Sequence, residues 1–78
     1  MRTFYCDVET EIGWGGFGRT IRVKANTLRG AFKRAKKFTR PDELIAEVRT
    51  RVRGCELAQP VWDFYNCRLG AIHFGLKL

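Results

Sequence analysis

The sequence predicts an α+β fold, in which a single antiparallel sheet carries one amphipathic helix on one face. Residues 2–10 and 19–25 alternate between apolar and polar side chains around a glycine-rich stretch, as the two strands of a β-hairpin do. Residues 27–40 instead repeat their apolar side chains at helical spacing. Three further expected strands give the order β-β-α-β-β-β. A chain of 78 residues suffices for one small domain, which we expect to span residues 1–78.

The hairpin pattern also predicts a register. On the inner face, Phe4, Cys6 and Val8 face the same way as Ile21, Val23 and Ala25. A two-residue turn at Gly15-Gly16 sets the pairs Val8–Val23, Cys6–Ala25 and Trp14–Phe17, with Glu9–Arg22 and Asp7–Lys24 on the outer face. Because an apolar set and a charged set match in the same register, we expect this pairing.

The expected helix, residues 27–40, has two distinct faces. Its apolar residues fall within about 120° of a helical wheel and are Leu28, Ala31, Phe32, Ala35 and Phe38. The other side carries Arg29, Lys33, Arg34, Lys36, Lys37 and Arg40, and the segment contains no acid. Asn26 or Thr27 is the expected N-cap, Pro41 ends the helix, and Gly30 indicates a close approach to the sheet.

Residues 41–53 support two interpretations. The sequence PDE at 41–43 is typical of a helix start, and Leu44, Ile45, Val48 and Val52 then share one side of a helix. Alternatively, Ala46, Val48, Thr50 and Val52 alternate with Glu47, Arg49, Arg51 and Arg53, as in a strand. We favour a short helical turn followed by a strand.

The last third of the chain predicts two more strands. Pro60 opens one through residues 60–67, with Trp62, Phe64 and Tyr65 in or at the edge of the core. After a turn at Gly70, residues 71–78 alternate with Ile72, Phe74, Leu76 and Leu78 on one face. A single helix covers only one face of such a sheet, so the other face is solvent-exposed or bound to a partner.

The charge balance favours an anionic partner. The chain has 15 Lys and Arg against 8 Asp and Glu, for a net charge of +7. A small domain of this charge favours nucleic acid, an acidic protein face or anionic lipid, unless the charge only keeps the surface solvated. The chain has neither a run of about 18 apolar residues nor a signal-peptide core, so we expect a cytoplasmic protein with no membrane partner.

Two cationic surfaces and one aromatic pair are the candidate binding sites. The first surface is the helix face described above. The second lies on the sheet face opposite the helix, where Arg49, Arg51 and Arg53 would project in a row at about 7 Å spacing, with Arg22 and Lys24 on the hairpin. Trp14 and Phe17, at the hairpin tip, either pack together or anchor a partner.

Catalysis, cofactors and metals find no support in the sequence. Cys6, Cys55 and Cys67 are an odd number without a C-x-x-C pair, which predicts three reduced thiols and leaves an intermolecular disulfide open. His73 is the only histidine, and neither a nucleophile nor a carboxylate pair accompanies it. We therefore expect no enzyme, no cofactor and no metal site.

The size, the element order and the one-helix, one-sheet layout resemble those of the small phage-encoded anti-CRISPR proteins, most of all from Arg2 to Phe38. The resemblance implies a cofactor-free inhibitor in the host bacterial cytoplasm. Such an inhibitor docks on a CRISPR effector complex and blocks target-DNA binding or nuclease recruitment. Many members are acidic DNA mimics, whereas a basic chain would contact acidic protein patches, guide RNA or DNA.

No motif carries functional residues over from that family. The alternative function is an autonomous, sequence-nonspecific DNA- or RNA-binding module that uses the same cations. Both functions are compatible with a monomer or a small homo-oligomer.

Overall fold

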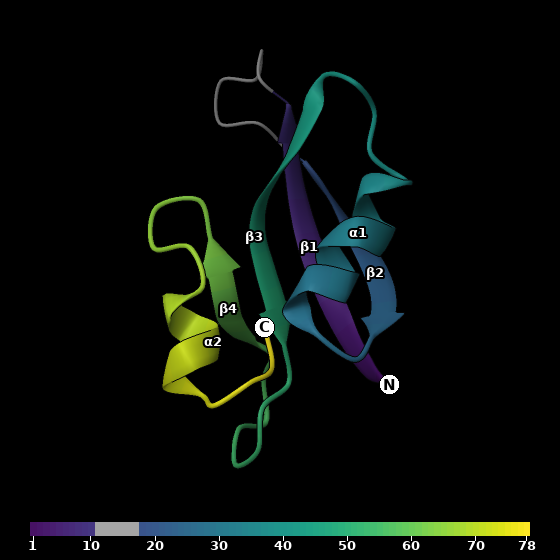
Figure 1. Cartoon of the computed structure of the whole chain (residues 1–78). Coiled ribbons are helices and arrows are strands. Elements are labelled where there is room, and N and C mark those ends of the chain that lie inside the picture. Colours follow the sequence, from purple (N-terminus) through teal and green to yellow (C-terminus); the bar gives the residue numbers. More distant parts are fainter. Residues whose placement is uncertain (11–17) are drawn as a thin grey trace.

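The fold is described from a computed structural model, which covers residues 1–10 and 18–78. Four strands form one open antiparallel sheet in the order β2-β1-β3-β4, and two short helices accompany it (Figure 1). The strands are β1 (Arg2–Thr10), β2 (Arg19–Ala25), β3 (Glu43–Thr50) and β4 (Gln59–Asp63); the helices are α1 (Leu28–Lys36) and α2 (Leu69–His73). The predicted α+β class with a single antiparallel sheet is confirmed.

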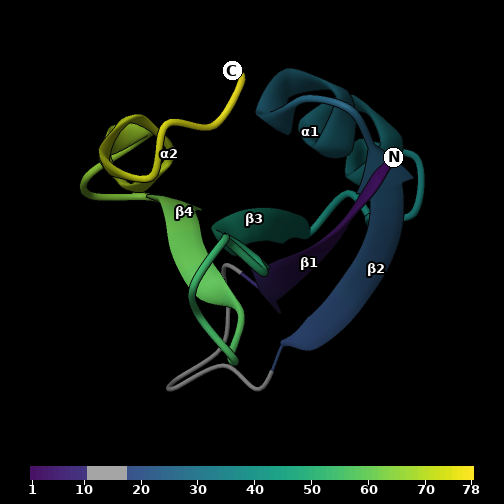
Figure 2. The same ribbon diagram turned by 90° about the horizontal axis from the view of Figure 1, so that it is seen from below.

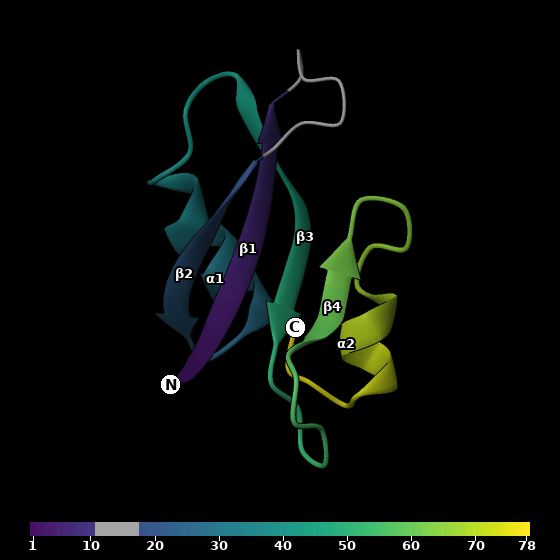
Figure 3. The same cartoon turned by 180° about the vertical axis from the view of Figure 1, so that it is seen from behind.

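Both helices lie on the same side of the sheet. Seen from below, α1 lies over β1 and β2, α2 lies beside β4, and the C-terminal segment runs between them (Figure 2). The view from behind shows the opposite face of the sheet, where neither α1 nor α2 lies in front of the strands (Figure 3). Within the described residues, the expectation that one sheet face is left without a helix is confirmed.

The core lies between the sheet and α1. The inward residues of β1 and β2 are buried as the alternation predicts, and α1 adds Leu28, Ala31 and Ala35. Burial of each Val- or Leu-sized side chain stabilises the fold by about 1.5–3 kcal/mol. The inward residues of the two strands are Phe4, Cys6, Val8, Ile21, Val23 and Ala25.

The predicted hairpin register is wrong, although the predicted faces are right. Val8 pairs with Arg19 instead of Val23, and Asp7 pairs with Thr20 instead of Lys24. The register differs by four residues, and an even shift keeps every side chain on its face because the strand period is two. Alternation therefore could not distinguish the two registers. The predicted turn and the Trp14–Phe17 pair fall outside the described residues.

A turn and then a strand follow α1, as the favoured interpretation of residues 41–53 expected. The N–H of Glu43 donates to the carbonyl of Arg40 across the turn (3.0 Å), and β3 begins at Glu43. A β-bulge shifts the pairing between β1 and β3, because Val8 pairs with Ile45 while its neighbour Asp7 pairs with Glu47. Ile45 and Val48 are consequently both buried although they are three residues apart.

The sixth element is a helix, so the predicted strand over residues 71–78 is wrong. Ala71 of α2 is fully buried, and a Cβ on Gly70 would come within 2.3 Å of the Pro60 carbonyl oxygen. Small residues thus let α2 pack directly on the backbone of β4. Gly70 was predicted to form a turn, but it lies in α2 and allows that helix to contact β4 closely.

The helix α2 ends in a Schellman motif that turns the chain back toward α1. Gly75 has a φ of +70°, and its N–H donates to the Ile72 carbonyl (3.1 Å). The next N–H, of Leu76, donates to the Ala71 carbonyl (2.9 Å). This pair of hydrogen bonds satisfies two of the last carbonyls of the helix. Glycine at position 75 adopts the left-handed conformation that the motif requires without steric cost.

Candidate functional site

The helix α1 is shorter than predicted but begins as expected. The Thr27 hydroxyl accepts the N–H of Gly30 (3.0 Å), which confirms Thr27 as the N-cap. A Cβ on Gly30 would lie 3.4 Å from the Cβ of Ala25, which is an ordinary van der Waals distance, so Gly30 lies against β2 but this contact does not require glycine. The helix ends at Lys36, and Phe38 lies beyond it with 61% of its surface exposed, so its predicted place in the buried stripe is wrong.

Four cations form an exposed surface that we call the α1 basic face: Arg29, Lys33, Lys36 and Lys37. Among the described residues, the ion pairs involve only the cations Arg19 and Arg49, so none of these four has a carboxylate within 4.0 Å there. Cations in the last turn also interact favourably with the helix dipole. The α1 basic face is therefore free to meet an anion from outside.

Two cations assigned to this helix face have other positions. The Arg34 guanidinium donates to the Lys24 carbonyl (2.7 Å), which ties α1 to β2. Arg40 lies beyond the helix, and its backbone N–H donates to the Glu43 carboxylate (2.7 Å). Arg34 thus stabilises the fold, whereas Arg40 belongs to the turn that leads into β3.

The amide groups at the start of α1 are occupied by the C-terminal segment. The N–H of Leu28 donates to the Lys77 carbonyl (3.2 Å), and that of Arg29 donates to the Leu78 carbonyl (2.9 Å). An anion that binds α1 must therefore be recognised by side chains rather than by the free amides of the helix N-terminus.

A groove between α1 and β4 lies next to the basic face, and we call it the α1–β4 groove. Phe32 and Trp62 meet in it edge to face, with 4.6 Å between ring centroids and 81° between ring planes. Both rings are half-buried, and a cavity of about 530 Å³ lies on each side of the pair. The prediction that Trp62, Phe64 and Tyr65 are core is wrong for Phe64 and Tyr65, which are exposed.

The predicted arginine row on the opposite sheet face does not exist as a row. The strand β3 ends at Thr50, so Arg51 and Arg53 lie in the segment that follows it. Arg49 is engaged by Asp7, with Nε to Oδ2 and Nη2 to Oδ1 both at 2.9 Å. Arg22 and Lys24 are exposed on β2, as expected.

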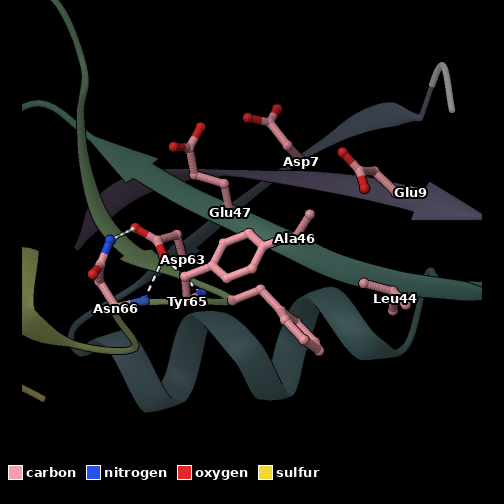
Figure 4. Close-up of a pocket in the computed structure, with 9 residues that line it drawn as sticks. Asp7, Glu9, Leu44, Ala46, Glu47, Asp63, Tyr65 and Asn66 are labelled. Atoms are coloured by element: carbon pink, nitrogen blue, oxygen red, sulfur yellow. Dashed lines mark hydrogen bonds between the residues drawn. The ribbon is translucent and has the colours of Figure 1, made fainter. Parts of the chain in front are cut away.

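This uncovered face instead carries a carboxylate row, defined by Asp7, Glu47 and Asp63. The register places Glu47 opposite Asp7 on one side and opposite Asp63 on the other. In the close-up, these three carboxylates project on the same side of the sheet, beside a cavity of about 640 Å³ (Figure 4). Sequence reasoning missed this row because it assigned Asp7 to the β2 cations and did not pair β3 with β4.

The three carboxylates of the row have different pKa values. Burial opposes ionisation of Asp7, but hydrogen bonds from Arg49 and Thr20 outweigh it and hold the pKa of Asp7 below its usual range. Burial, and then the neighbouring Asp7 charge, raise the pKa of Glu47. The backbone N–H and side chain of Asn66 lower the pKa of Asp63. The acids of this face are thus partly compensated within the fold.

The three cysteines are free thiols in different surroundings. Cys6 is fully buried, and burial raises the pKa of its thiol to about 11. Cys55 is half-buried, whereas Cys67 is exposed, with a φ of +51°, and lines one cavity of the α1–β4 groove. An intermolecular disulfide stays a prediction, and Cys67 has the accessibility that it requires.

Two further absences apply to the described part of the chain. No three Asp, Glu, His or Cys side chains within residues 1–10 and 18–78 are grouped so as to hold a metal ion. No helix in these same two stretches is long and apolar enough to cross a membrane.

His73 lies at the end of α2 with its ring 4.9 Å from that of Phe74. The predicted aromatic anchor, Trp14 and Phe17, lies outside the described residues.

Comparison with known proteins identifies no relative. No family model matches the chain, and neither a curated protein nor a solved structure matches it. The function must therefore be inferred from this chain's own surfaces, among which the α1 basic face gathers four exposed cations without an ion pair to any described carboxylate.

Proposed function

We propose that this protein is a non-enzymatic binding protein that docks on a polyanion through the α1 basic face. The observation that carries the proposal is that α1 gathers exposed cations in a segment without acids, whereas the uncovered face of the sheet mixes acids with cations. No acid occurs from Thr27 to Arg40, while Asp7, Glu47 and Asp63 lie together on the uncovered face. A charge that served only solubility would need no such concentration of cations on one helix face.

The chemistry of the α1 basic face suits phosphate groups. Lysine ammonium groups and an arginine guanidinium on one exposed helix face can neutralise several phosphates along a nucleic-acid backbone. Such contacts give affinity and orientation but no choice of base. The proposed binding is accordingly nonspecific in sequence and strongly dependent on salt.

The proposed setting is a bacterial nucleoprotein complex in the host cytoplasm, and a CRISPR effector is the complex that the layout resemblance suggests. In this setting the α1 basic face would dock on the guide-RNA backbone or on an acidic protein patch, and the bound protein would then obstruct the binding of target DNA. The second candidate is an autonomous nucleic-acid-binding module. It is favoured by the aromatic pair Phe32 and Trp62, which lies beside the same cations.

The test is charge reversal on one face against equal reversal elsewhere. The variant Lys33→Glu, Lys36→Glu, Lys37→Glu and the control Arg22→Glu, Lys24→Glu, Arg51→Glu change the net charge by the same amount. Affinity for duplex DNA and for RNA is measured over a salt series. For each tenfold rise in salt concentration, log K falls by about 0.9 per duplex phosphate neutralised. We expect the α1 variant alone to lose at least tenfold in affinity and to flatten the slope.

Equal losses in the two variants would show that net charge alone determines binding. If the unmodified protein binds neither DNA nor RNA at low salt, the autonomous module is excluded. A purified CRISPR effector complex with labelled target DNA then tests the inhibitor directly. Unchanged target binding at stoichiometric excess of this protein contradicts inhibition at the DNA-binding step, and a nuclease-recruitment assay tests the other step.

A further inference from the structure

The α1–β4 groove combines aromatic rings with cations on both of its sides. Phe32 and Trp62 form the wall between its two cavities, and both rings line each cavity. Half-buried aromatic rings that border open space of about 530 Å³ on either side leave room for a flat ring beside them.

The charges around the two cavities are positive. Arg29 and Arg68 line the first cavity, and no Asp or Glu among residues 1–10 and 18–78 lines it. Lys36 and Arg40 line the second cavity. Its single acid, Glu43, has its carboxylate engaged by the Arg19 guanidinium and by the Arg40 backbone N–H. Each cavity therefore offers two cations next to an aromatic ring.

We propose that the α1–β4 groove binds a single-stranded nucleic acid, with bases stacked on Phe32 or Trp62 and adjacent phosphates held by Arg29, Arg68, Lys36 and Arg40. The proposal rests on the proposed function, because it names the form of polyanion that the same helix recognises. Charge complementarity selects the occupant, since an apolar peptide would leave four cations without partners. Sequence-tolerant stacking beside a cationic groove is how proteins bind single strands generally.

A single strand fits this groove better than a duplex does. The faces of the bases are covered by their neighbours in a duplex, so rings set within a groove cannot stack on them. In a single strand the bases can turn outward, and every base presents a flat face. The groove is thus expected to bind single strands more tightly than duplexes, a preference that the α1 basic face alone would not give.

The binding test uses fluorescently labelled oligo-dT and oligo-U of twelve nucleotides and a duplex of equal length. Trp62→Leu removes the larger ring while keeping an apolar side chain, and Trp62→Phe restores an aromatic face. Phe64→Leu changes an exposed aromatic residue that lines neither cavity of the groove. We expect Trp62→Leu to weaken single-strand binding about tenfold, as loss of one stacked base does, with duplex binding little changed. Trp62→Phe should recover most of the loss, and Phe64→Leu should have no effect.

The native thiols provide a second readout that does not depend on a variant's folding. Cys67 lines the groove and is exposed, whereas Cys55 lies in the segment between β3 and β4. Saturating oligo-dT or oligo-U should slow alkylation of Cys67 at least fivefold and leave that of Cys55 unchanged. Protection by one oligonucleotide and not by the other identifies whether DNA or RNA is the ligand.

Four outcomes overturn the groove proposal. The first three are equal affinity for single strand and duplex, unchanged binding by Trp62→Leu, and unprotected Cys67 at saturation. The fourth is displacement of the labelled oligonucleotide by poly-glutamate as readily as by unlabelled oligonucleotide. It would show that an acidic chain suffices and that no base is recognised. In any of these cases the proposed function still stands if reversal of Lys33, Lys36 and Lys37 abolishes binding, so the two failures are distinguishable.

Discussion

The guanidinium of Arg49 binds both carboxylate oxygens of Asp7, with each N–O distance at 2.9 Å. The two residues lie diagonally across neighbouring strands, because Asp7 pairs with Glu47 and Arg49 pairs with Tyr5. The contact withdraws Arg49 from the set of cations available to a partner. It also fixes an acid on the uncovered face, away from the cations of α1.

Removal of the Asp7 carboxylate should destabilise the fold modestly. Asp7→Asn breaks the bidentate contact with Arg49 and weakens the hydrogen bond from Thr20 (2.7 Å). Because both charged side chains are about one-third exposed, we expect a loss of only about 1 kcal/mol in the free energy of unfolding. Urea denaturation measures it, with Glu9→Gln as the control on the same strand. A loss as large in the control would assign the effect to general charge.

The same carboxylate predicts a pH dependence of stability. The pKa of Asp7 is lower in the folded protein than in the unfolded chain, so its contribution is fully present above the unfolded value of about 4. That contribution is lost as the pH falls from there through the folded pKa. Melting temperatures between pH 2 and pH 6 should therefore drop more steeply for the unmodified protein than for Asp7→Asn. Parallel curves would contradict the role of Asp7.

Glu47 should show the opposite sign. Burial and the neighbouring Asp7 raise its pKa, so the folded protein favours the protonated form. Its contribution is greatest below the unfolded pKa and declines as the pH rises through the folded pKa. We expect Glu47→Gln to stabilise the protein at pH 7, by less than about 1 kcal/mol because the side chain is 39% exposed. The gain should vanish below pH 4, and a loss at pH 7 would show that its 3.8 Å contact with Arg49 dominates.

The features predicted correctly from the sequence are those that depend on neighbouring residues. Alternation along β1 and β2 assigns each side chain to a face, and the Thr27 cap depends on Gly30, three residues later. The basic face of α1 follows in the same way from helical spacing. These patterns are local, and the structure departs from them only at Arg34, which binds β2, and at Phe38 and Arg40, which lie beyond the end of α1.

The features that the sequence did not reveal depend on contacts between distant segments. Asp7 and Arg49 are 42 positions apart, and no local pattern distinguishes that pairing from one between Asp7 and Lys24. The β-bulge in the pairing of β1 with β3 likewise puts Ile45, rather than Ala46, in the core. The groove needs α1 beside β4, and hence Phe32 beside Trp62, an arrangement that the C-terminal segment helps to hold.

The contact between α2 and β4 predicts that Gly70 tolerates no side chain. A Cβ there would lie 2.3 Å from the Pro60 carbonyl oxygen and 2.9 Å from the Val61 Cα, both of which are backbone atoms. Gly70→Ala should push α2 off the sheet and cost at least about 2 kcal/mol in the free energy of unfolding, as other overpacked contacts do. Ile72→Ala, at an exposed position on the same helix, is the control. Equal stability of Gly70→Ala and the unmodified protein would mean that α2 does not pack on β4.

Gly75 should couple the end of α2 to the start of α1. Its φ of +70° costs a non-glycine residue about 1–2 kcal/mol, so Gly75→Ala should weaken the Schellman motif while Gly75→Asn should do so less. Gly54 has a φ of +86° and equally open surroundings, which makes Gly54→Ala a matched control for backbone strain. Residues 77 and 78 accept the N–H groups of Leu28 and Arg29, so loss of the motif should expose these amides. Hydrogen exchange at both should accelerate in Gly75→Ala and stay unchanged in Gly54→Ala. Equal acceleration in the two variants would show a global loss of stability instead of a local coupling between the helices.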